Sequence, residues 1–181
     1  MPRREAAAKR YAQAILAIAE NDGTLDRWAT DLATLHALTA EPTVGDFLTS
    51  SKIEESRKHE VIEQGMAGAD PKAISLAKLL VRKNRIGIVD QIAESFGELL
   101  NVERGIAIGR VTTAVPMTDE GRSSVIEAIR RSTGATEVQL EEIVDRNVLG
   151  GAVIQIGDHI VDGSVRSRLS GLRRTIAGSL S

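Results

Sequence analysis

Apolar residues recur at helical spacing through roughly the first hundred residues. Leu25, Trp28, Leu32 and Leu35, for example, follow one another at intervals that place them on one face of a helix. Interruptions by glycine and proline divide this pattern into six helices. They are expected from 6 to about 21, from 25 up to residue 42, around 43–48, and over about 54–66, 72–83 and 86–104. Short helices with short connections indicate a compact all-α domain.

Residue types that favour helix ends support these divisions. Thr24 is placed to cap the second helix, and Pro42 is expected to end that region. Asp70 followed by Pro71 combines a capping side chain with a proline at the first helical position, which predicts the start of the fifth helix.

The period changes near Gly105. From Ile106 the chain alternates and becomes β-branched, which predicts a strand that Pro116 ends. Thr118 is expected to cap a helix that Gly134 terminates, and three more strands and a final helix follow. We therefore expect a two-domain, mainly α protein, with an N-terminal six-helix bundle over 1–105 and a small α+β domain over 106–181.

The last third of the chain predicts a hairpin and a helix start. After Gly150 and Gly151, strands at 153–156 and 159–161 flank Gly157 and Asp158, a two-residue turn with glycine first. Asp162, Gly163 and Ser164 are expected to break the second strand, with Ser164 capping a helix from residue 165. That helix has one apolar stripe, off which lie four basic residues: Arg166, Arg168, Arg173 and Arg174. Such a segment suggests a structural or docking element.

Composition narrows the class of protein. Hydrophobic residues make up 42 % of the chain but aromatic residues only 2 %, so the core must consist of Leu, Ile, Val and Ala. The formal net charge of -2 gives no strong field for nucleic acid or anionic lipid. The absence of cysteine excludes disulfides and thiol catalysis. No apolar run approaches the ~20 residues of a membrane span, so we expect a soluble chain that reaches a membrane through partners.

No motif for catalysis or cofactor binding is found. The chain has no Gly-Lys dipeptide for a phosphate loop and no G-x-G-x-x-G. His59-Glu60 begins a zinc-protease pattern, but Glu63 stands where the second histidine belongs. Asp158 and Asp162 are better explained as turn and junction residues than as a general acid and base. We predict no catalytic residue, no cofactor and no metal.

Two helices have more apolar surface than one contact needs. Polar residues of the first helix fall within about 120° of its circumference, and those of the fifth helix occupy a similarly narrow arc. A surface helix needs an apolar stripe only a little over 100° wide. Either both helices are central in the bundle, or they pack side by side and offer a surface to a partner helix.

The motifs of both ends resemble those of one family. Gly150-Gly151, Gly157-Asp158, the run from Asp162 to Arg166, and Arg168-Leu169 resemble the signature of the delta subunit of F-type ATP synthase. The mitochondrial counterpart of that subunit is the oligomycin-sensitivity-conferring protein. Arg10-Tyr11-Ala12 in the first helix and Trp28 in the second also match. The resemblance covers essentially the whole chain.

The resemblance implies a non-catalytic stator subunit that links the catalytic head to the peripheral stalk. The N-terminal bundle would bind N-terminal helices of the alpha subunit, and the second domain would bind b-type stalk subunits through the four arginines. The positions that match the alpha-binding surface are Tyr11, Ala14, Ile18, Ser75, Leu79 and Arg82. The expected location is peripheral, within the complex, at the cytoplasmic face of the bacterial plasma membrane.

The resemblance has departures, and other functions remain possible. Ser167 and Ser170 stand where the family commonly has glycine and glutamate, and Arg146 replaces a frequent proline. A nucleic-acid-binding module that uses the C-terminal arginines is the main alternative; steep salt dependence would mark it. An enzyme with an unfamiliar site is the third possibility.

Overall fold

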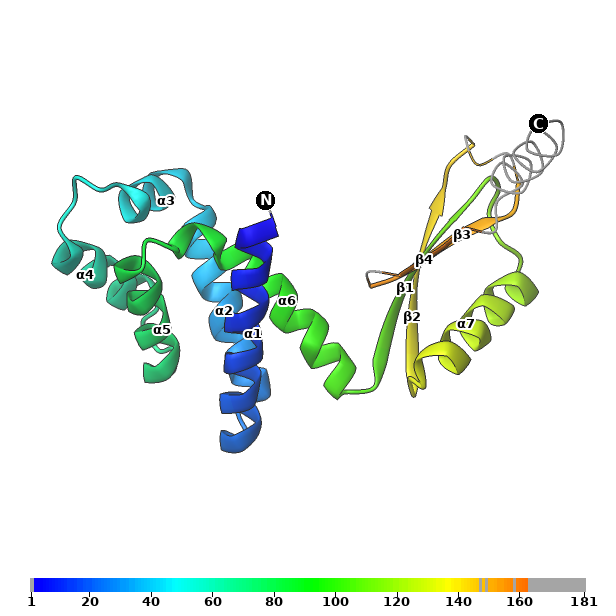
Figure 1. The fold of residues 1–181 in the computed structure, drawn as a ribbon, viewed down its shortest axis with the longest axis horizontal. Helices are drawn as coiled ribbons and strands as arrows, with labels where there is room; N and C mark the ends of the chain where they lie inside the picture. The colour runs from blue at the N-terminus through cyan, green and yellow to red at the C-terminus, as the bar shows by residue number, and fades with distance from the viewer. Residues whose placement is uncertain (1, 147, 149, 158, 163–181) are drawn as a thin grey trace, which may run out of the picture. The chain divides into compact units, whose positions relative to one another are not determined.

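The computed structural model describes residues 2–146, 148, 150–157 and 159–162. Contacts divide the chain into two compact units, one ending at Leu100 and the other beginning at Asn101. Figure 1 shows helices in the first part of the chain and the strands with a further helix in the second. The described residues are mainly helical with a small sheet, which confirms the predicted fold class at that level.

Helices make up the N-terminal unit. They are α1 (Pro2–Asp22), α2 (Leu25–Ala40), α3 (Pro42–Thr49), α4 (Glu55–Gly65), α5 (Pro71–Arg82), the single 3-10 turn η1 (Ile86–Ile88) and α6 (Val89–Glu103). The Asp70 carboxylate accepts a hydrogen bond from the Lys72 amide at 2.8 Å, with Pro71 in the first turn, so the predicted start of α5 is confirmed. α2 ends at Ala40, just before Pro42, as expected, and Pro42 itself lies in the first turn of α3, which Glu41 caps.

The prediction that Thr24 caps α2 is wrong. Its side chain makes no capping hydrogen bond, and its ψ of 28° lies outside the extended region that capping residues adopt. The end of α1 determines this conformation. Gly23 has a φ of +66°, its amide donates to the Glu20 carbonyl, and the Thr24 amide donates to the Ala19 carbonyl at 2.8 Å. These are the two hydrogen bonds of a Schellman motif. The backbone amide of Thr24 therefore helps to end α1, and its side chain does not cap α2.

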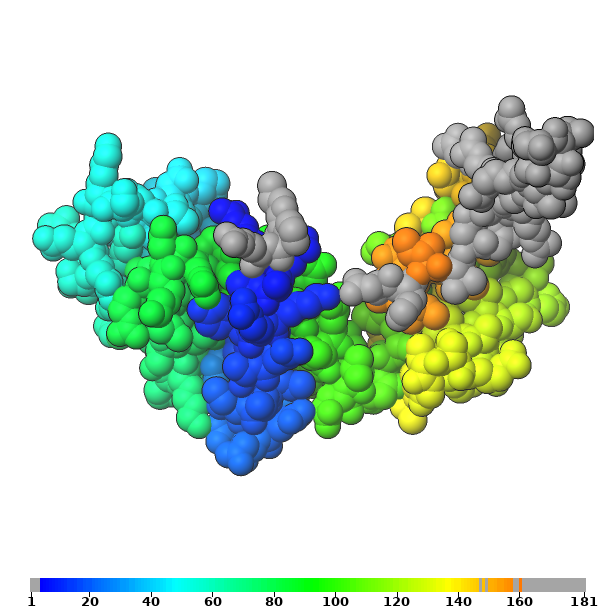
Figure 2. Space-filling model, viewed as in Figure 1, coloured from blue at the N-terminus to red at the C-terminus, as the bar shows by residue number. Residues whose placement is uncertain are grey.

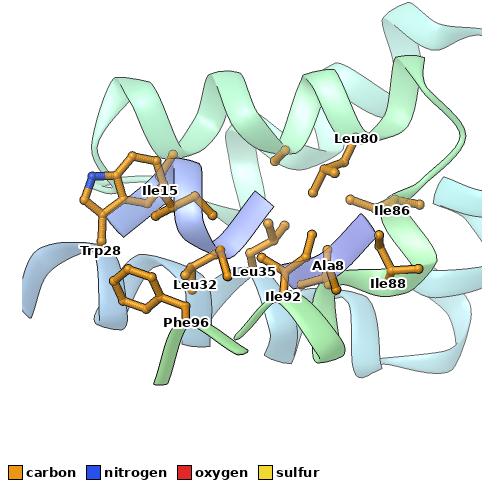
Figure 3. Close-up of a cluster of buried hydrophobic side chains, with 14 of the residues drawn as sticks. Ala8, Ile15, Trp28, Leu32, Leu35, Leu80, Ile86, Ile88, Ile92 and Phe96 are labelled. Atoms are coloured by element: carbon orange, nitrogen blue, oxygen red, sulfur yellow. The ribbon is translucent and has the colours of Figure 1, made fainter. Parts of the chain in front are cut away.

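The core of the N-terminal unit is aliphatic, with one tryptophan and one buried phenylalanine. Figure 3 shows Trp28, Leu32 and Leu35 of α2 packed with residues from α1, α5, η1 and α6. Ile92 of α6 and Leu80 of α5 are completely buried. Small residues of α1 complete the cluster: Ala8, Ala12 and Ala19 have no exposed surface. The core therefore follows the low aromatic content of the sequence.

The second unit is a small sheet with one described helix. Its elements are β1 (Ile106–Thr113), α7 (Asp119–Thr133), β2 (Glu137–Val144), β3 (Ala152–Ile156) and β4 (His159–Asp162). The strand order is β2-β1-β3-β4; β1 and β2 are parallel, and the other neighbours are antiparallel. Because parallel strands need a crossover, α7 connects β1 to β2. The Thr118 hydroxyl accepts from the Gly121 amide, and Gly134 has a φ of +72°, so both predicted ends of α7 are confirmed.

One face of the sheet packs on α7. Val111 of β1 and Ile129 of α7 are buried, whereas Ile108 and Arg110 alternate with Val111 and are exposed. A Cβ on Gly109 would lie 2.5 Å from the Ile129 side chain, so glycine at this position lets the helix approach the strand closely.

The predicted hairpin is confirmed where the structure describes it. Ile156 pairs with His159, and Gly157 has a φ of +54°, as a tight two-residue connection requires. Asp162 was expected to break the second strand, but it still pairs with Val153, so β4 is one residue longer. Asp158, the predicted helix from 165 with its four arginines, and the preceding Gly163 and Ser164 lie outside the described residues.

Truncating Ile92 tests the core assignment. Ile92→Ala removes buried methyl groups and leaves a cavity, so we expect the free energy of unfolding to fall by about 2–5 kcal/mol. Trp28 is the only tryptophan and is 2 % exposed, so its fluorescence reports urea unfolding of this unit. Val102→Ala at a position 74 % exposed is the control, with a change within about 0.5 kcal/mol. Equal effects of the two substitutions would contradict the assignment.

Candidate partner-binding surface

Two polar contacts connect α1 with α5 and with Arg85, which follows the end of α5. Near one end, Lys72 in the first turn of α5 forms an ion pair with Asp22, the last residue of α1. Beyond the last residue of α5, Arg85 Nη1 donates to the hydroxyl of Tyr11, in the middle of α1, at 3.3 Å, and the guanidinium lies 5.9 Å from the centre of the tyrosine ring. The order of these contacts along the chain indicates that α1 and α5 run in opposite directions. Figure 2 shows α1, in blue, on the face of the unit turned toward the viewer.

The six residues expected to bind a partner lie between or beside these contacts. We call them the α1–α5 surface: Tyr11, Ala14, Ile18, Ser75, Leu79 and Arg82. Ala14, Ser75 and Arg82 are exposed, Ile18 is 42 % exposed, and Tyr11 and Leu79 are half-buried. Tyr11 also packs against the core, whereas Ile18 and Leu79 are not among the side chains that do.

Helix geometry explains why these residues remain accessible. On α1, Ile15 and Ala19 point into the core, and Ala14 and Ile18 precede them by one position on the neighbouring side. On α5, Leu79 lies seven residues after Lys72 and hence about 20° from it, on the side that faces α1. The opposite flank of α5 is taken by α4, because Lys78 forms an ion pair with Glu63. The exposure of Ile18 favours the second interpretation of α1, as a helix with a free apolar side.

The ion pairs shift pKa values in the expected directions. The hydrogen bond from Lys72 holds the pKa of Asp22 below its ordinary value, and the same bond raises the pKa of Lys72. A hydrogen bond from Lys78 likewise lowers the pKa of Glu63. Because water surrounds these groups, each ion pair contributes little to the free energy of unfolding. Each pair does, however, hold two neighbouring helices in place.

Some contacts around this surface were not foreseen from the sequence. Asp31 is 5 % exposed, and its carboxylate accepts a hydrogen bond from the Asp70 amide at 2.9 Å and lies 3.7 Å from Arg27 Nε. Arg27 also donates to the Gly68 carbonyl at 2.7 Å, so α2 holds the loop that begins α5. The four-residue spacing of Arg27 and Asp31 predicts an ion pair on one helix. It does not predict that both residues also contact the loop before α5.

The surface is suited to binding and not to reaction chemistry. Its side chains offer aliphatic area, one hydroxyl, one phenol and one guanidinium. Among the residues that the structure describes, no group of His, Cys, Asp and Glu could hold a metal ion. His59 lies 3.4 Å from Glu55 on the same helix, which is the spacing of successive helical turns. None of the described helices is both long enough and apolar enough to cross a bilayer.

Comparisons with known proteins agree with the resemblance of the sequence. The family model for the ATP synthase delta (OSCP) subunit matches residues 7–176. ATP synthase subunit delta of Dehalococcoides mccartyi is 34 % identical over 172 residues, covering 95 % of this chain and 94 % of the relative. The subunit delta of a Geobacillus species is 31 % identical over 176 residues, covering 97 % and 99 %.

A solved structure shares the fold. A chain of the mitochondrial ATP synthase hexamer of Toxoplasma gondii aligns with a TM-score of 0.69 and 19 % identity, covering 94 % of this chain and 97 % of that one. The fold is thus one found in an ATP synthase assembly. The chain belongs to the ATP synthase delta (OSCP) subunit family. Members of this family are non-catalytic subunits of the stator, and that is the function of this chain.

The Asp22–Lys72 pair predicts a specific pH dependence. Since the pKa of Asp22 is lowered by folding, the contribution of the pair is complete above the unfolded pKa of ~4 and is lost as the pH falls through the folded pKa. The difference in unfolding free energy between the wild type and Asp22→Asn should therefore shrink as the pH falls below about 4. Lys72→Met should give the same trend. Urea titrations followed through Trp28 measure it, and parallel curves for all three proteins would contradict the pairing.

Proposed function

We propose that the α1–α5 surface binds an N-terminal helix of an ATP synthase alpha subunit and that the second unit binds b-type subunits of the peripheral stalk. The observation that carries the first part is the apolar strip between two polar contacts, formed by the exposed Ala14 and Ile18 and the half-buried Leu79. An amphipathic helix can bury its apolar face on such a strip. The six positions are also those that match the alpha-binding surface of the family.

The side chains of this surface suit close packing. Ala14 and Ser75 are small and allow a third helix to approach the backbone of α1 and α5. Ile18 and Leu79 supply the aliphatic area, at about 25 cal/mol per Å² buried. Nanomolar affinity corresponds to about −12 kcal/mol, so the surface would form the buried centre of a larger interface with a polar rim.

Slow dissociation is what the stator role requires. Rotation of the central shaft exerts torque on the catalytic head, and the head must be held for proton flow to be coupled to ATP synthesis. A subunit that grips the head with one unit and the stalk with the other provides this restraint without chemistry. We place the chain at the cytoplasmic face of the bacterial plasma membrane, as a peripheral part of the complex.

The stalk-binding role rests on the basic C-terminal end. Arg166, Arg168, Arg173 and Arg174 are the matching positions, and no acidic residue follows Asp162. The planar guanidinium of arginine can bind a carboxylate through two parallel hydrogen bonds, so acidic positions of the stalk helices are the expected partners. The alternative of a nucleic-acid-binding module has no support from the family to which the chain belongs.

A charge placed on the α1–α5 surface tests the alpha-binding role. In the full chain, Leu79→Asp and Ile18→Asp each remove aliphatic contact with the partner helix. Each also places a carboxylate where the partner helix would bury it. We expect each to weaken binding of a synthetic alpha-subunit N-terminal peptide at least about tenfold. Isothermal titration calorimetry gives the affinities, and urea unfolding confirms that each variant is folded. Tyr11 is not substituted in this experiment, because it also packs against the core and its loss could unfold the unit.

Ile143→Asp is the matched control, because Ile143 is 38 % exposed but lies on β2 of the other unit. It should bind the peptide like the wild type. Unchanged affinity of both surface variants, or equal losses for the control, would remove the assignment.

A further inference from the structure

The two ends of the α1–α5 surface differ in charge. At the end where Arg85 contacts Tyr11, Arg10, Arg82 and Lys83 are also exposed. At the other end, Lys72 is paired with Asp22, and the neighbouring Glu20 and Asn21 add no positive charge. A helix lying along this surface would therefore have cations at one of its ends only.

The cations at the basic end have free donor groups. Arg10 uses Nε to donate to the Ala6 carbonyl of its own helix, and Arg85 uses Nη1 for the Tyr11 hydroxyl. Within the described part of the chain, the side chains of Arg82 and Lys83 have no hydrogen-bond or ion-pair partner. The exposed carboxylates nearest in sequence, Glu5 and Asp90, form no ion pair with these four cations among the described residues.

The positions of Arg10 and Arg82 place them beside the apolar strip. Arg10 precedes Ala14 by four residues on α1, and Arg82 follows Leu79 by three on α5, so each is a neighbour of that apolar residue on its helix surface. Since the helices are antiparallel, both arginines come at the same end. Guanidinium groups beside an aliphatic strip favour a partner that combines an apolar face with carboxylates.

We propose that this surface orients the bound helix by its charge: the acidic end of the partner helix, whichever terminus carries it, lies over Arg10, Arg82 and Arg85. The inference rests on the proposed helix-binding function and adds the partner's chemistry and alignment to it. The apolar strip provides affinity, and the basic end selects which way the partner lies.

Three synthetic amphipathic peptides of equal length and identical apolar face test this with the full chain. One carries three glutamates in its first two turns, one carries them in its last two turns, and one has glutamines instead. A nitroxide label is attached at the acidic end of each charged peptide. Paramagnetic broadening of backbone amides then locates that end on the isotope-labelled protein.

In both charged peptides the label should broaden the amides of Lys83 and Arg85 and spare those of Asn21 and Lys72. At low salt both should bind about tenfold more tightly than the glutamine peptide, from a few exposed charge pairs. The double variant Arg10→Gln/Arg82→Gln should lose that difference. The matched variant Lys52→Gln/Arg57→Gln, at two exposed cations outside the surface, should keep it.

The outcomes separate this inference from the proposed function. If the glutamine peptide binds as tightly as the others, or if the same terminus always lies at the same end, charge-based orientation is overturned and helix binding stands. If no peptide binds, the helix-binding function fails and the inference fails with it.

Discussion

The double use of α1 is the constraint on which the rest of the structure depends. Its core-facing side consists of Ala8, Ala12, Ile15 and Ala19, all almost completely buried. Because alanines allow close approach, α1 packs into the core without using Ile18 or the exposed part of Tyr11. The same helix thus stabilises the unit and keeps a second apolar side exposed, while Asp22 contacts Lys72 of α5 and Tyr11 contacts Arg85 just beyond it.

The two units have different architectures. The N-terminal unit presents helix surfaces, which suit the docking of another helix. In the second unit, the parallel pair β1 and β2 is joined by α7, and β3 and β4 extend the sheet by antiparallel pairing. The chain belongs to a family of non-catalytic stator subunits.

Local signals in the sequence predicted most elements but not their tertiary contacts. Asp70 and Thr118 act through residues two or three positions away, so their caps could be predicted. Thr24 could not, because the end of the preceding helix fixes its backbone. The strands followed from the change of period, whereas the order β2-β1-β3-β4 depends on pairings distant in sequence. The six surface residues came from family resemblance; their accessibility, and the contacts Asp22–Lys72 and Tyr11–Arg85, required the structure.

The most direct test of a helix-binding α1–α5 surface is a methyl NMR titration of the full chain with an alpha-subunit N-terminal peptide. The account predicts that the methyl signals of Ile18 and Leu79 shift most, while those of the buried Ile62 of α4 and Ile129 of α7 stay in place. Shifts concentrated on α4, α7 or the sheet, with Ile18 and Leu79 unaffected, would contradict it.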